Sequence, residues 1–211
     1  MDKYHIDPTL RSSIQVNLQR FERCNATDET LRPAAVAIVI TATAYNGGAG
    51  FVLTRRANSL RHHSGQYALP GGRVDPGESP QAAALRELSE ELGLTLSEHD
   101  VLGRLDDYST RSGFRISPFV MWRDADTDII ANPDEVDAVF RIPLAELDRP
   151  EIPQLDQIPE SDSPVLSAPF PTLGHEVYAP TAAILYQFRE VALHGRCTRV
   201  AHYEQPLFAW R

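Results

Sequence analysis

Residues 72–94 read GRVDPGESPQAAALRELSEELGL, and this stretch decides the fold and the chemistry that we expect of the chain. Ser79 is a good N-cap, and Pro80 is acceptable at the first helical position because an N–H there would have no partner within the helix. Gly93 is a natural helix stop, since glycine adopts the left-handed conformation at little cost. The stretch therefore predicts a helix of about three and a half turns from Pro80 to Leu92.

The predicted helix separates apolar from acidic side chains around its axis. One face carries an apolar stripe, made of Leu85, Leu88 and Leu92. A different face carries three carboxylates, those of Glu87, Glu90 and Glu91. One side of the helix is therefore expected to pack against a core while the other is free to bind.

The three glutamates predict a metal site. Like charges at this spacing destabilise a helix by a few tenths of a kcal/mol per pair unless a cation lies between them. Carboxylates are hard oxygen ligands, which favours Mg²⁺ or Mn²⁺. Such an ion would stabilise charge on a leaving phosphate and lower the pKa of an attacking water, so we expect hydrolysis of a diphosphate. The alternative is a solvated acidic face, which is what a run of charges usually means.

Neighbouring residues fit the metal interpretation. Arg86 lies about 100° around the helix from Glu87, so we expect it to orient a carboxylate rather than to touch substrate. Glu78 precedes the helix and is placed either to join the carboxylates or to pair with Arg86. Gly71 and Gly72 let the backbone approach a phosphate or a metal closely, so we assign Gly72 to the metal and Gly71 to the substrate.

The same stretch resembles the Nudix hydrolase box, G-x5-E-x7-R-E-U-x-E-E-x-G-U, where U is apolar. Every specified position matches: Gly72, Glu78, Arg86, Glu87, Leu88, Glu90, Glu91, Gly93 and Leu94. Because the pattern fixes many identities at rigid spacing, it is far more specific than a lone glycine motif. The resemblance implies a divalent-metal hydrolase of diphosphate compounds.

The preceding segment resembles the additional signature of the coenzyme A diphosphatase branch, L-L-T-x-R-[SA]-x3-R-x3-G-x3-F-P-G-G. The matching residues are Thr54, Arg56, Ala57, Arg61, Gly65, Pro70, Gly71 and Gly72. Val52 replaces the first leucine and Leu69 replaces the phenylalanine, and both keep the position apolar. The resemblance implies that coenzyme A (CoA) or a derivative is split into 3′,5′-ADP and a 4′-phosphopantetheine moiety.

The charges of this segment agree with a phosphate substrate. Arg56 and Arg61 belong to a cationic patch, with Arg55, His62 and His63, in a chain of net charge −9. Arginine suits phosphate because its planar fork holds two oxygens at once. We therefore expect Arg56 and Arg61 to contact substrate, the alternative being that they pair with surface acids.

Glu135 is a further candidate, because it lies in a segment, Asn132–Leu147, that also looks like this branch. A carboxylate in this region often serves Nudix enzymes as a metal ligand or as the base. The alternatives are that Glu135 meets only solvent, or that Glu87 or Glu90 is the base.

Composition limits the other possibilities. The chain has 211 residues, a pI near 5.2 and 42% hydrophobic residues, which fits one core and argues against general nucleic-acid binding. Cys24 and Cys197 are too few for a disulfide framework. The sequence shows neither a signal peptide nor an apolar run of about 20 residues. We expect a cytoplasmic protein whose partner is a small-molecule substrate, with a homodimer as an option.

The pattern of elements predicts the fold class. We expect a helix from Pro8 to about Cys24, a buried strand over Ala34–Thr43, and a hairpin through Asn46-Gly47-Gly48 into a second strand at Phe51–Thr54. Further strands are expected near Val101–Asp107, Ile116–Trp122 and Val136–Ile142, followed by a helix at Pro180–His194. The order resembles the Nudix α/β/α sandwich, an α/β (α+β) fold with a mixed sheet between helices.

We divide the chain into an N-terminal helical extension, residues 1–30, and a single Nudix domain, residues 31–211. Within the domain, residues 149–174 hold six prolines, too many for a regular element. We expect an ordered surface loop there, with a lid over the pantetheine arm or an oligomer contact as alternatives. The tail, Thr198–Trp210, is expected to be a terminal strand or a packed arm.

Two other functions compete with CoA diphosphatase. One is hydrolysis of another nucleoside diphosphate compound such as ADP-ribose, which a comparison of substrates with and without a 3′-phosphate would separate. The other is a non-catalytic Nudix module that senses a nucleotide, for which the intact glutamates are unnecessary because a pure binder needs no activated water.

Overall fold

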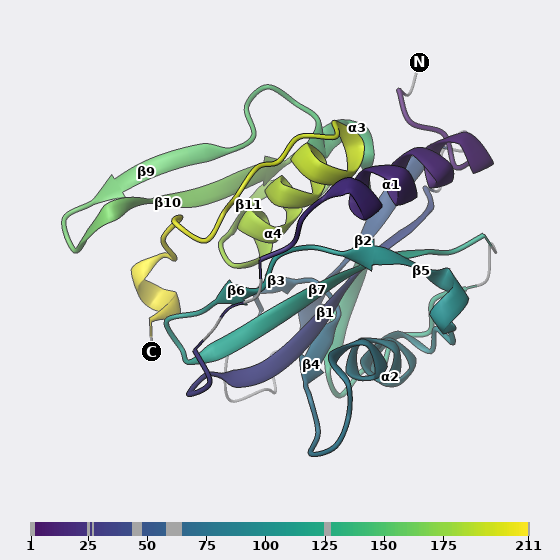
Figure 1. Ribbon diagram of the computed structural model, residues 1–211, viewed down its shortest axis with the longest axis horizontal. Helices are drawn as coiled ribbons and strands as arrows, with labels where there is room; N and C mark the ends of the chain where they lie inside the picture. The colour runs from purple at the N-terminus through teal and green to yellow at the C-terminus, as the bar shows by residue number, and fades with distance from the viewer. Residues whose placement is uncertain are drawn as a thin grey trace.

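The computed structural model describes residues 3–24, 26, 28–43, 48–57, 65–124 and 128–210. Two sheets and four α-helices make up most of these residues (Figure 1). The elements are α1 (Pro8–Arg20), β1 (Arg32–Ala42), β2 (Ala49–Arg56), β3 (Tyr67–Ala68), β4 (Gly71–Arg73), α2 (Pro80–Leu92), β5 (Val101–Arg104), β6 (Tyr108–Ser109), β7 (Phe114–Trp122), β8 (Val136–Pro143), α3 (Leu144–Leu147), β9 (Gln154–Ile158), β10 (Ser161–Phe170), β11 (His175–Tyr178) and α4 (Thr181–Phe188). A π-helical turn, Arg189–Leu193, continues α4, and short 3-10 turns lie at Glu98–Asp100 and Leu207–Ala209.

The larger sheet is mixed, as the sequence predicted. Its path runs β3-β2-β1-β7-β5, with β4 paired to β1, β6 to β7 and β8 to β2. β1 and β7 pair in parallel over nine residue pairs, from Arg32↔Phe114 to Ile40↔Trp122, while the other pairings are antiparallel. The strands predicted at Ala34–Thr43, Ile116–Trp122 and Val136–Ile142 are therefore confirmed within a few residues.

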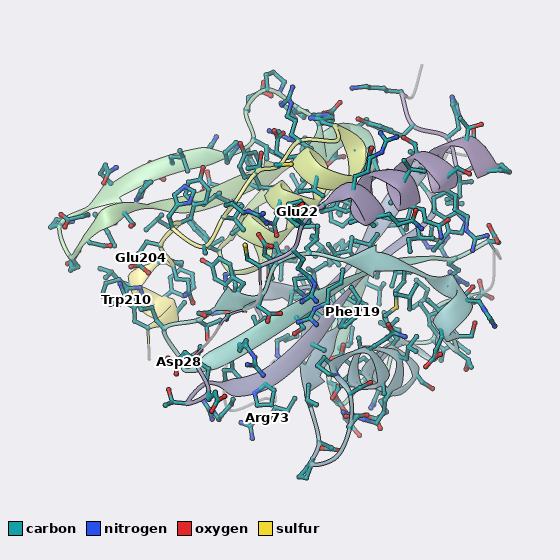
Figure 2. The ribbon with its side chains drawn as sticks, viewed as in Figure 1. Glu22, Asp28, Arg73, Phe119, Glu204 and Trp210 are labelled. Carbon is teal, nitrogen blue, oxygen red and sulfur yellow. The ribbon has the colours of Figure 1, made fainter. Side chains whose placement is uncertain are left out.

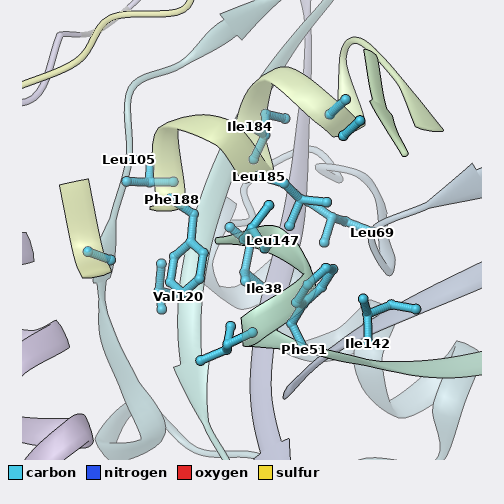
Figure 3. Packing of buried hydrophobic residues seen from close by; sticks show 14 of the residues in the cluster. Ile38, Phe51, Leu69, Leu105, Val120, Ile142, Leu147, Ile184, Leu185 and Phe188 are labelled. Carbon is cyan, nitrogen blue, oxygen red and sulfur yellow. The ribbon is translucent and has the colours of Figure 1, made fainter. Parts of the chain in front are cut away.

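Side chains of β1 alternate between two hydrophobic cores. Ala37 and Val39 pack with Leu88 and Leu92 of α2, whereas Ile38 and Ile40 face the opposite layer. Figure 3 shows Ile38, Phe51 and Val120 packed beneath Leu185 and Phe188 of the C-terminal helix. Because both faces of the sheet are covered, its central strands are continuously apolar. The predicted α/β/α sandwich is confirmed.

Helix α2 begins and ends where the sequence predicted. The Ser79 hydroxyl oxygen accepts a hydrogen bond from the Ala82 N–H at 3.1 Å, and Pro80 occupies the first turn. Gly93 closes the helix in the left-handed conformation, with φ 63°. Leu88 and Leu92 are fully buried, which stabilises the docking of the helix by roughly 1.5–3 kcal/mol for each side chain. This packing fixes which side of α2 carries the glutamates.

The N-terminal helix α1 lies on the opposite layer, beside α4 (Figure 1). It ends at Arg20, four residues before the predicted end, because Phe21 is extended. Ile14 and Leu18 are buried in the same core as Ile38. A side chain at Gly103 of β5 would meet Leu18, since its Cβ would lie 2.9 Å from the Leu18 Cβ. The helix is thus part of the main core.

The prediction of a loop over residues 149–174 is wrong. β9 and β10 lie in this segment and pair with β11 in a separate three-stranded antiparallel sheet. Three of the six prolines lie where strands tolerate them: Pro153 precedes β9, Pro159 follows it, and Pro164 falls at a shift in register. Residues 44–47, in the predicted hairpin turn, lie outside the described residues, although the pair Ala42↔Ala49 confirms the hairpin. None of the described helices is long and apolar enough to cross a membrane.

Candidate active site

The acidic face of α2 meets a second carboxylate-bearing segment at the end of the sheet. Ligand atoms of Glu87, Glu91 and Glu135 lie within 4.8 Å of one another. We call these three residues the glutamate cluster. Glu87 and Glu91 come from α2, whereas Glu135 lies directly before β8. The structure therefore joins residues that are more than forty positions apart in sequence.

Burial makes this cluster unfavourable for negative charge. The Glu91 side chain is 3% exposed and the Glu87 side chain is 14% exposed. Burial raises the pKa of Glu91 to about 7, and the nearby charges of Glu87 and Glu135 act in the same direction. Burial likewise raises the pKa of Glu87, against the influence of Arg86. A group that compensates this charge would therefore bind favourably.

The groups that surround Glu91 compensate its negative charge only weakly. The Gly71 N–H donates a hydrogen bond to Glu91 Oε2 at 3.1 Å. The Arg56 guanidinium lies 3.8 Å from Glu91 Oε1, beyond hydrogen-bonding distance. Both lower the pKa of Glu91, but the effect of burial is larger.

Arg86 is the hub of a second network beside the cluster. Its Nη1 donates to Glu87 Oε1 and to Glu90 Oε2, both at 2.9 Å. Its Nε donates to Glu78 Oε1 at 3.0 Å, and its Nη2 donates to the Arg73 carbonyl oxygen at 3.0 Å. The bond to Glu87 is of the kind that would orient this carboxylate, and the orienting role of Arg86 stays a prediction.

The two glycines of β4 make the close approach of backbone and carboxylates possible. A Cβ on Gly72 would lie 2.3 Å from Glu87 Oε1, so any side chain there would displace this carboxylate. Gly71 has φ +149°, and a Cβ there would lie 2.2 Å from the Ala35 carbonyl oxygen. The strand thus packs directly between β1 and the glutamates.

Backbone bonds hold the loop of Glu135 against α2. The Asn132 N–H donates to the Glu91 carbonyl oxygen at 2.9 Å, and the Ala57 N–H donates to the Glu135 carbonyl oxygen at 2.8 Å. The Asn132 side chain approaches Glu135 Oε1 at 3.4 Å. This loop brings the carboxylate of Glu135 to the cluster.

A cavity of about 620 Å³ lies on the α4 side of the sheet. Arg56, Gly71 and Gly72 line its inner end, so they touch both the cavity and the surroundings of the cluster. Arg73 also lines it and marks the lower edge of the sheet in Figure 2. The remaining lining is mostly apolar. A molecule in the cavity would therefore present one end to the glutamates.

The cluster fits a hard divalent cation. Its donors are all carboxylate oxygens, two of the three residues are largely buried, and no arginine neutralises Glu91 at hydrogen-bonding distance among the described residues. Mg²⁺ and Mn²⁺ prefer such oxygen ligands. The residues that would hold the ion are Glu87, Glu91 and Glu135.

The predicted site residues fall into three groups. Glu87, Glu91 and Glu135 come together in the cluster. Glu90 and Glu78 instead bond Arg86, and the Glu90 side chain is 53% exposed, so the structure leaves both outside the cluster. Arg61, with its neighbours His62 and His63, lies outside the described residues.

Sequence reasoning missed the outer wall of the cavity and the part played by Asn132. His175, Tyr178 and Phe208 line the cavity although they are more than a hundred residues from Gly71. No local pattern marks them, because their proximity arises from the second sheet and the C-terminal segment. Asn132 was within reach of sequence reasoning, since an asparagine before a proline in a turn commonly bonds the nearby backbone.

Comparisons with known proteins agree with this geometry. A family model described as NUDIX domain matches residues 31–166, more than half of the chain. Nudix hydrolase 3 of Caenorhabditis elegans is 36% identical over 118 residues, which are 54% of this chain and 49% of that protein. The protein named Uncharacterized Nudix hydrolase NudL of Cronobacter sakazakii is 45% identical over 98 residues, which are 46% and 51% of the two chains. The chain thus spans about half the length of these curated relatives.

Solved structures match this chain at low identity and with TM-scores below 0.5. A MutT/nudix family protein from Enterococcus faecalis has a TM-score of 0.48 at 18% identity, over 68% of this chain and 53% of that chain. The NUDIX domain of Shewanella oneidensis NrtR, complexed with ADP ribose, has a TM-score of 0.44 at 20% identity, over 57% and 77%. With the family model covering most of the larger sheet, α2 and the loop of Glu135, the chain belongs to the Nudix family.

Proposed function

We propose that the chain is a metal-dependent Nudix hydrolase that splits the diphosphate bond of CoA or a derivative. The products would be 3′,5′-ADP and 4′-phosphopantetheine or its acylated form. The observation that carries the proposal is the buried glutamate cluster, whose Glu91 contacts Gly71 and Arg56 in the lining of a cavity. A pure nucleotide sensor has no need of three converging carboxylates, and burying their charge is costly without a cation.

Each residue of the site has a role in this proposal. A bound Mg²⁺ or Mn²⁺ would stabilise the charge of the diphosphate and make a water molecule more acidic. Glu87, Glu91 and Glu135 would hold the ion, and Glu90 would join them if its side chain turned away from Arg86. Arg86 keeps the Glu87 carboxylate in place through bonds of 2.9–3.1 Å to the surrounding glutamates. Glu135, Glu87 or Glu90 would accept the proton of the water.

The choice of CoA rests on the segment before the box and on the charges beside the cluster. Arg56 matches the signature and lies where it would meet a diphosphate bound at Glu91. Arg55 and Arg73 also line the cavity, and Arg55 is paired with Asp137 at 2.6 Å. Guanidinium groups in the lining suit a substrate with a diphosphate and a further phosphate. Arg61 stays a predicted substrate contact.

The cytoplasmic location, the domain division and the oligomeric state of the protein also remain our proposals. Cys24 and Cys197 are both free and exposed, which agrees with a reducing cytoplasm. We keep residues 31–211 as a single Nudix domain with residues 1–30 as an N-terminal helical extension. A homodimer stays a prediction.

Product analysis by mass spectrometry tests the function. The enzyme is given CoA, dephospho-CoA or ADP-ribose in the presence of Mg²⁺, Mn²⁺ or EDTA. We expect release of 3′,5′-ADP from CoA, faster than cleavage of the other two and abolished by EDTA. Faster cleavage of ADP-ribose would contradict the CoA assignment but keep the metal mechanism, and binding without turnover in Mg²⁺ would contradict the enzyme itself.

A further inference from the structure

The outer wall of the cavity is built by a part of the chain that follows residue 166, where the family match ends. His175, Tyr178 and Thr181 come from β11 and the start of α4, and Gln205 and Phe208 come from the C-terminal segment. The inner end, by contrast, is made by β2 and β4 within the matched region. The two ends of the cavity therefore have separate origins in the sequence.

The C-terminal part of this wall is firmly anchored. Ser161 and Arg111 both donate to the Glu204 carboxylate, the former at 3.1 Å. The Trp210 indole N–H donates to the Gln205 carbonyl oxygen at 2.8 Å, and the Arg111 guanidinium lies over the Trp210 ring. Glu204 and Trp210 appear together at the left of Figure 2. These contacts hold Phe208 against the Tyr178 ring, with centroids 5.7 Å apart and ring planes at 89°.

Charge is distributed unevenly along the cavity. The guanidinium groups among its described lining residues are those of Arg55, Arg56 and Arg73, which belong to β2 and β4. Arg56 lies 3.8 Å from Glu91, whereas Arg55 forms an ion pair with Asp137 at 2.6 Å. The described outer wall carries no arginine or lysine and includes the carboxylate of Glu176, which accepts a hydrogen bond from Tyr178 at 2.9 Å. Phosphate is thus favoured at the inner end, whereas the outer wall favours an uncharged group.

The size of the cavity indicates a group larger than a nucleobase. A volume of about 620 Å³ corresponds to roughly twenty water-sized groups. A purine base would fill only a small part of this space, and the longer pantetheine arm of CoA would occupy more of it. The lining of Val36, Leu69, Ile116, Val177 and Ile184 also suits a flexible chain, because it offers continuous aliphatic surface.

We propose, on the basis of the function proposed above, that this cavity binds the uncharged pantetheine arm of the substrate. The outer wall, with Phe208 and Tyr178, then determines specificity for that arm. The diphosphate lies at the inner end by the glutamate cluster, and the 3′-phosphoadenosine half extends away from the cavity.

Binding of free pantetheine tests this assignment without turnover. Calorimetric titrations are made in EDTA with the wild type, Phe208→Ala and Leu207→Ala. Phe208 and Leu207 share one 3-10 turn and are 57% and 43% exposed, but only Phe208 lines the cavity. We expect Phe208→Ala to weaken binding about tenfold through lost apolar contact, and Leu207→Ala to leave it unchanged. Equal affinities of the wild type and Phe208→Ala would overturn the assignment.

Turnover by the same variants shows whether the cavity binds the pantetheine arm or the nucleobase of the substrate. CoA and dephospho-CoA carry the arm, whereas ADP-ribose carries only the adenosine diphosphate half. Relative to Leu207→Ala, we expect Phe208→Ala to raise KM about tenfold for the first two and to leave the low rate with ADP-ribose unchanged. An equal loss for all three substrates would place the base in the cavity and refute our assignment while the hydrolase stands. If the wild type cleaves none of them, the proposed function fails, and pantetheine titration still decides what the cavity binds.

Discussion

The glutamate cluster and the cavity beside it differ in how they are encoded. The cluster draws two of its three residues from one turn of α2, whereas the cavity is lined by residues that range from Ala34 to Ala209. The cluster is charged and shared with the Nudix family pattern, whereas the cavity is mostly apolar and its outer wall lies beyond the family match. In the function that we propose, the chemistry of the reaction and the choice of substrate are therefore carried by different parts of the chain.

The largest effect should come from removing the charge of Glu91. Glu91→Gln keeps the size of the side chain but removes a buried metal ligand, so we expect turnover to fall about a thousandfold. The fold should persist, because Leu88 and Leu92 still anchor α2. Steady-state kinetics with CoA and Mg²⁺ measure the loss, and Glu98→Gln, an exposed glutamate just beyond the helix, is the matched control.

A Glu91→Gln variant with nearly full activity would refute the metal assignment. Glu90→Gln adds a finer test within the same helix. A strong loss there would show that Glu90 leaves Arg86 and joins the cluster during the reaction, whereas a small loss would confine the ligands to the three residues that the structure brings together.

The raised pKa of Glu91 predicts how the metal-free protein responds to pH. Below pH 4.5 this carboxyl is protonated in both the folded and the unfolded state. Between pH 4.5 and about 7 only the unfolded state ionises it, so folding stability falls as pH rises, by up to about 3 kcal/mol. Glu91→Gln removes this loss. Urea denaturation in EDTA should therefore show the variant gaining stability over the wild type from pH 5 to pH 8.

Titrating groups away from the glutamate cluster are shared by the two proteins and cancel in this comparison. Parallel stability profiles for the wild type and Glu91→Gln would show that the carboxyl is not destabilised by burial. Addition of Mg²⁺ at pH 8 should stabilise the wild type more than the variant, because only the wild type offers the ionised ligand.

A smaller effect is expected from Gly72→Ala. The new Cβ would lie 2.3 Å from Glu87 Oε1 and push the carboxylate out of the cluster. We expect Mg²⁺ affinity to fall about 10- to 100-fold, as when the support of a metal ligand is lost. Gly77→Ala is the control, since its Cβ would meet nothing within 4 Å although φ is +83°. It should lower stability but not the affinity measured by calorimetry, and equal affinities of the two variants would contradict the account.

The smallest effect concerns the start of α2. Ser79→Ala removes the hydroxyl that accepts the Ala82 N–H and should lower the free energy of unfolding by about 1 kcal/mol. Ser89→Ala, at an exposed position in the same helix, should cost nothing. Activity at saturating Mg²⁺ should stay near the wild-type value in both variants. A large loss of activity in Ser79→Ala would mean that the cap, rather than the packing of Leu88, positions the glutamates.

The difference between the locally encoded cluster and the cavity built by distant segments also explains which features the sequence could predict. Helix α2 and the buried strands follow from local periodicity, capping and spacing, and so does the nearness of Arg86 to the glutamates that it bonds. The β9–β10 hairpin was missed because only the number of prolines was considered. Their positions matter more, since several lie at the ends of the strands or at the shift in register. The candidacy of Glu135 as a site residue beside Glu91 came from the family resemblance. The outer wall of the cavity, with Tyr178 and Phe208, had no signal in the sequence, because only tertiary contacts bring these residues near Gly71.

The most direct test of the central claim is an anomalous diffraction experiment on crystals soaked in Mn²⁺. We expect a Mn²⁺ peak within coordination distance of the carboxylates of Glu87, Glu91 and Glu135, and loss of that peak in Glu91→Gln. A Mn²⁺ ion bound elsewhere, with these three carboxylates making no contact to it, would show that the cluster is not the metal site.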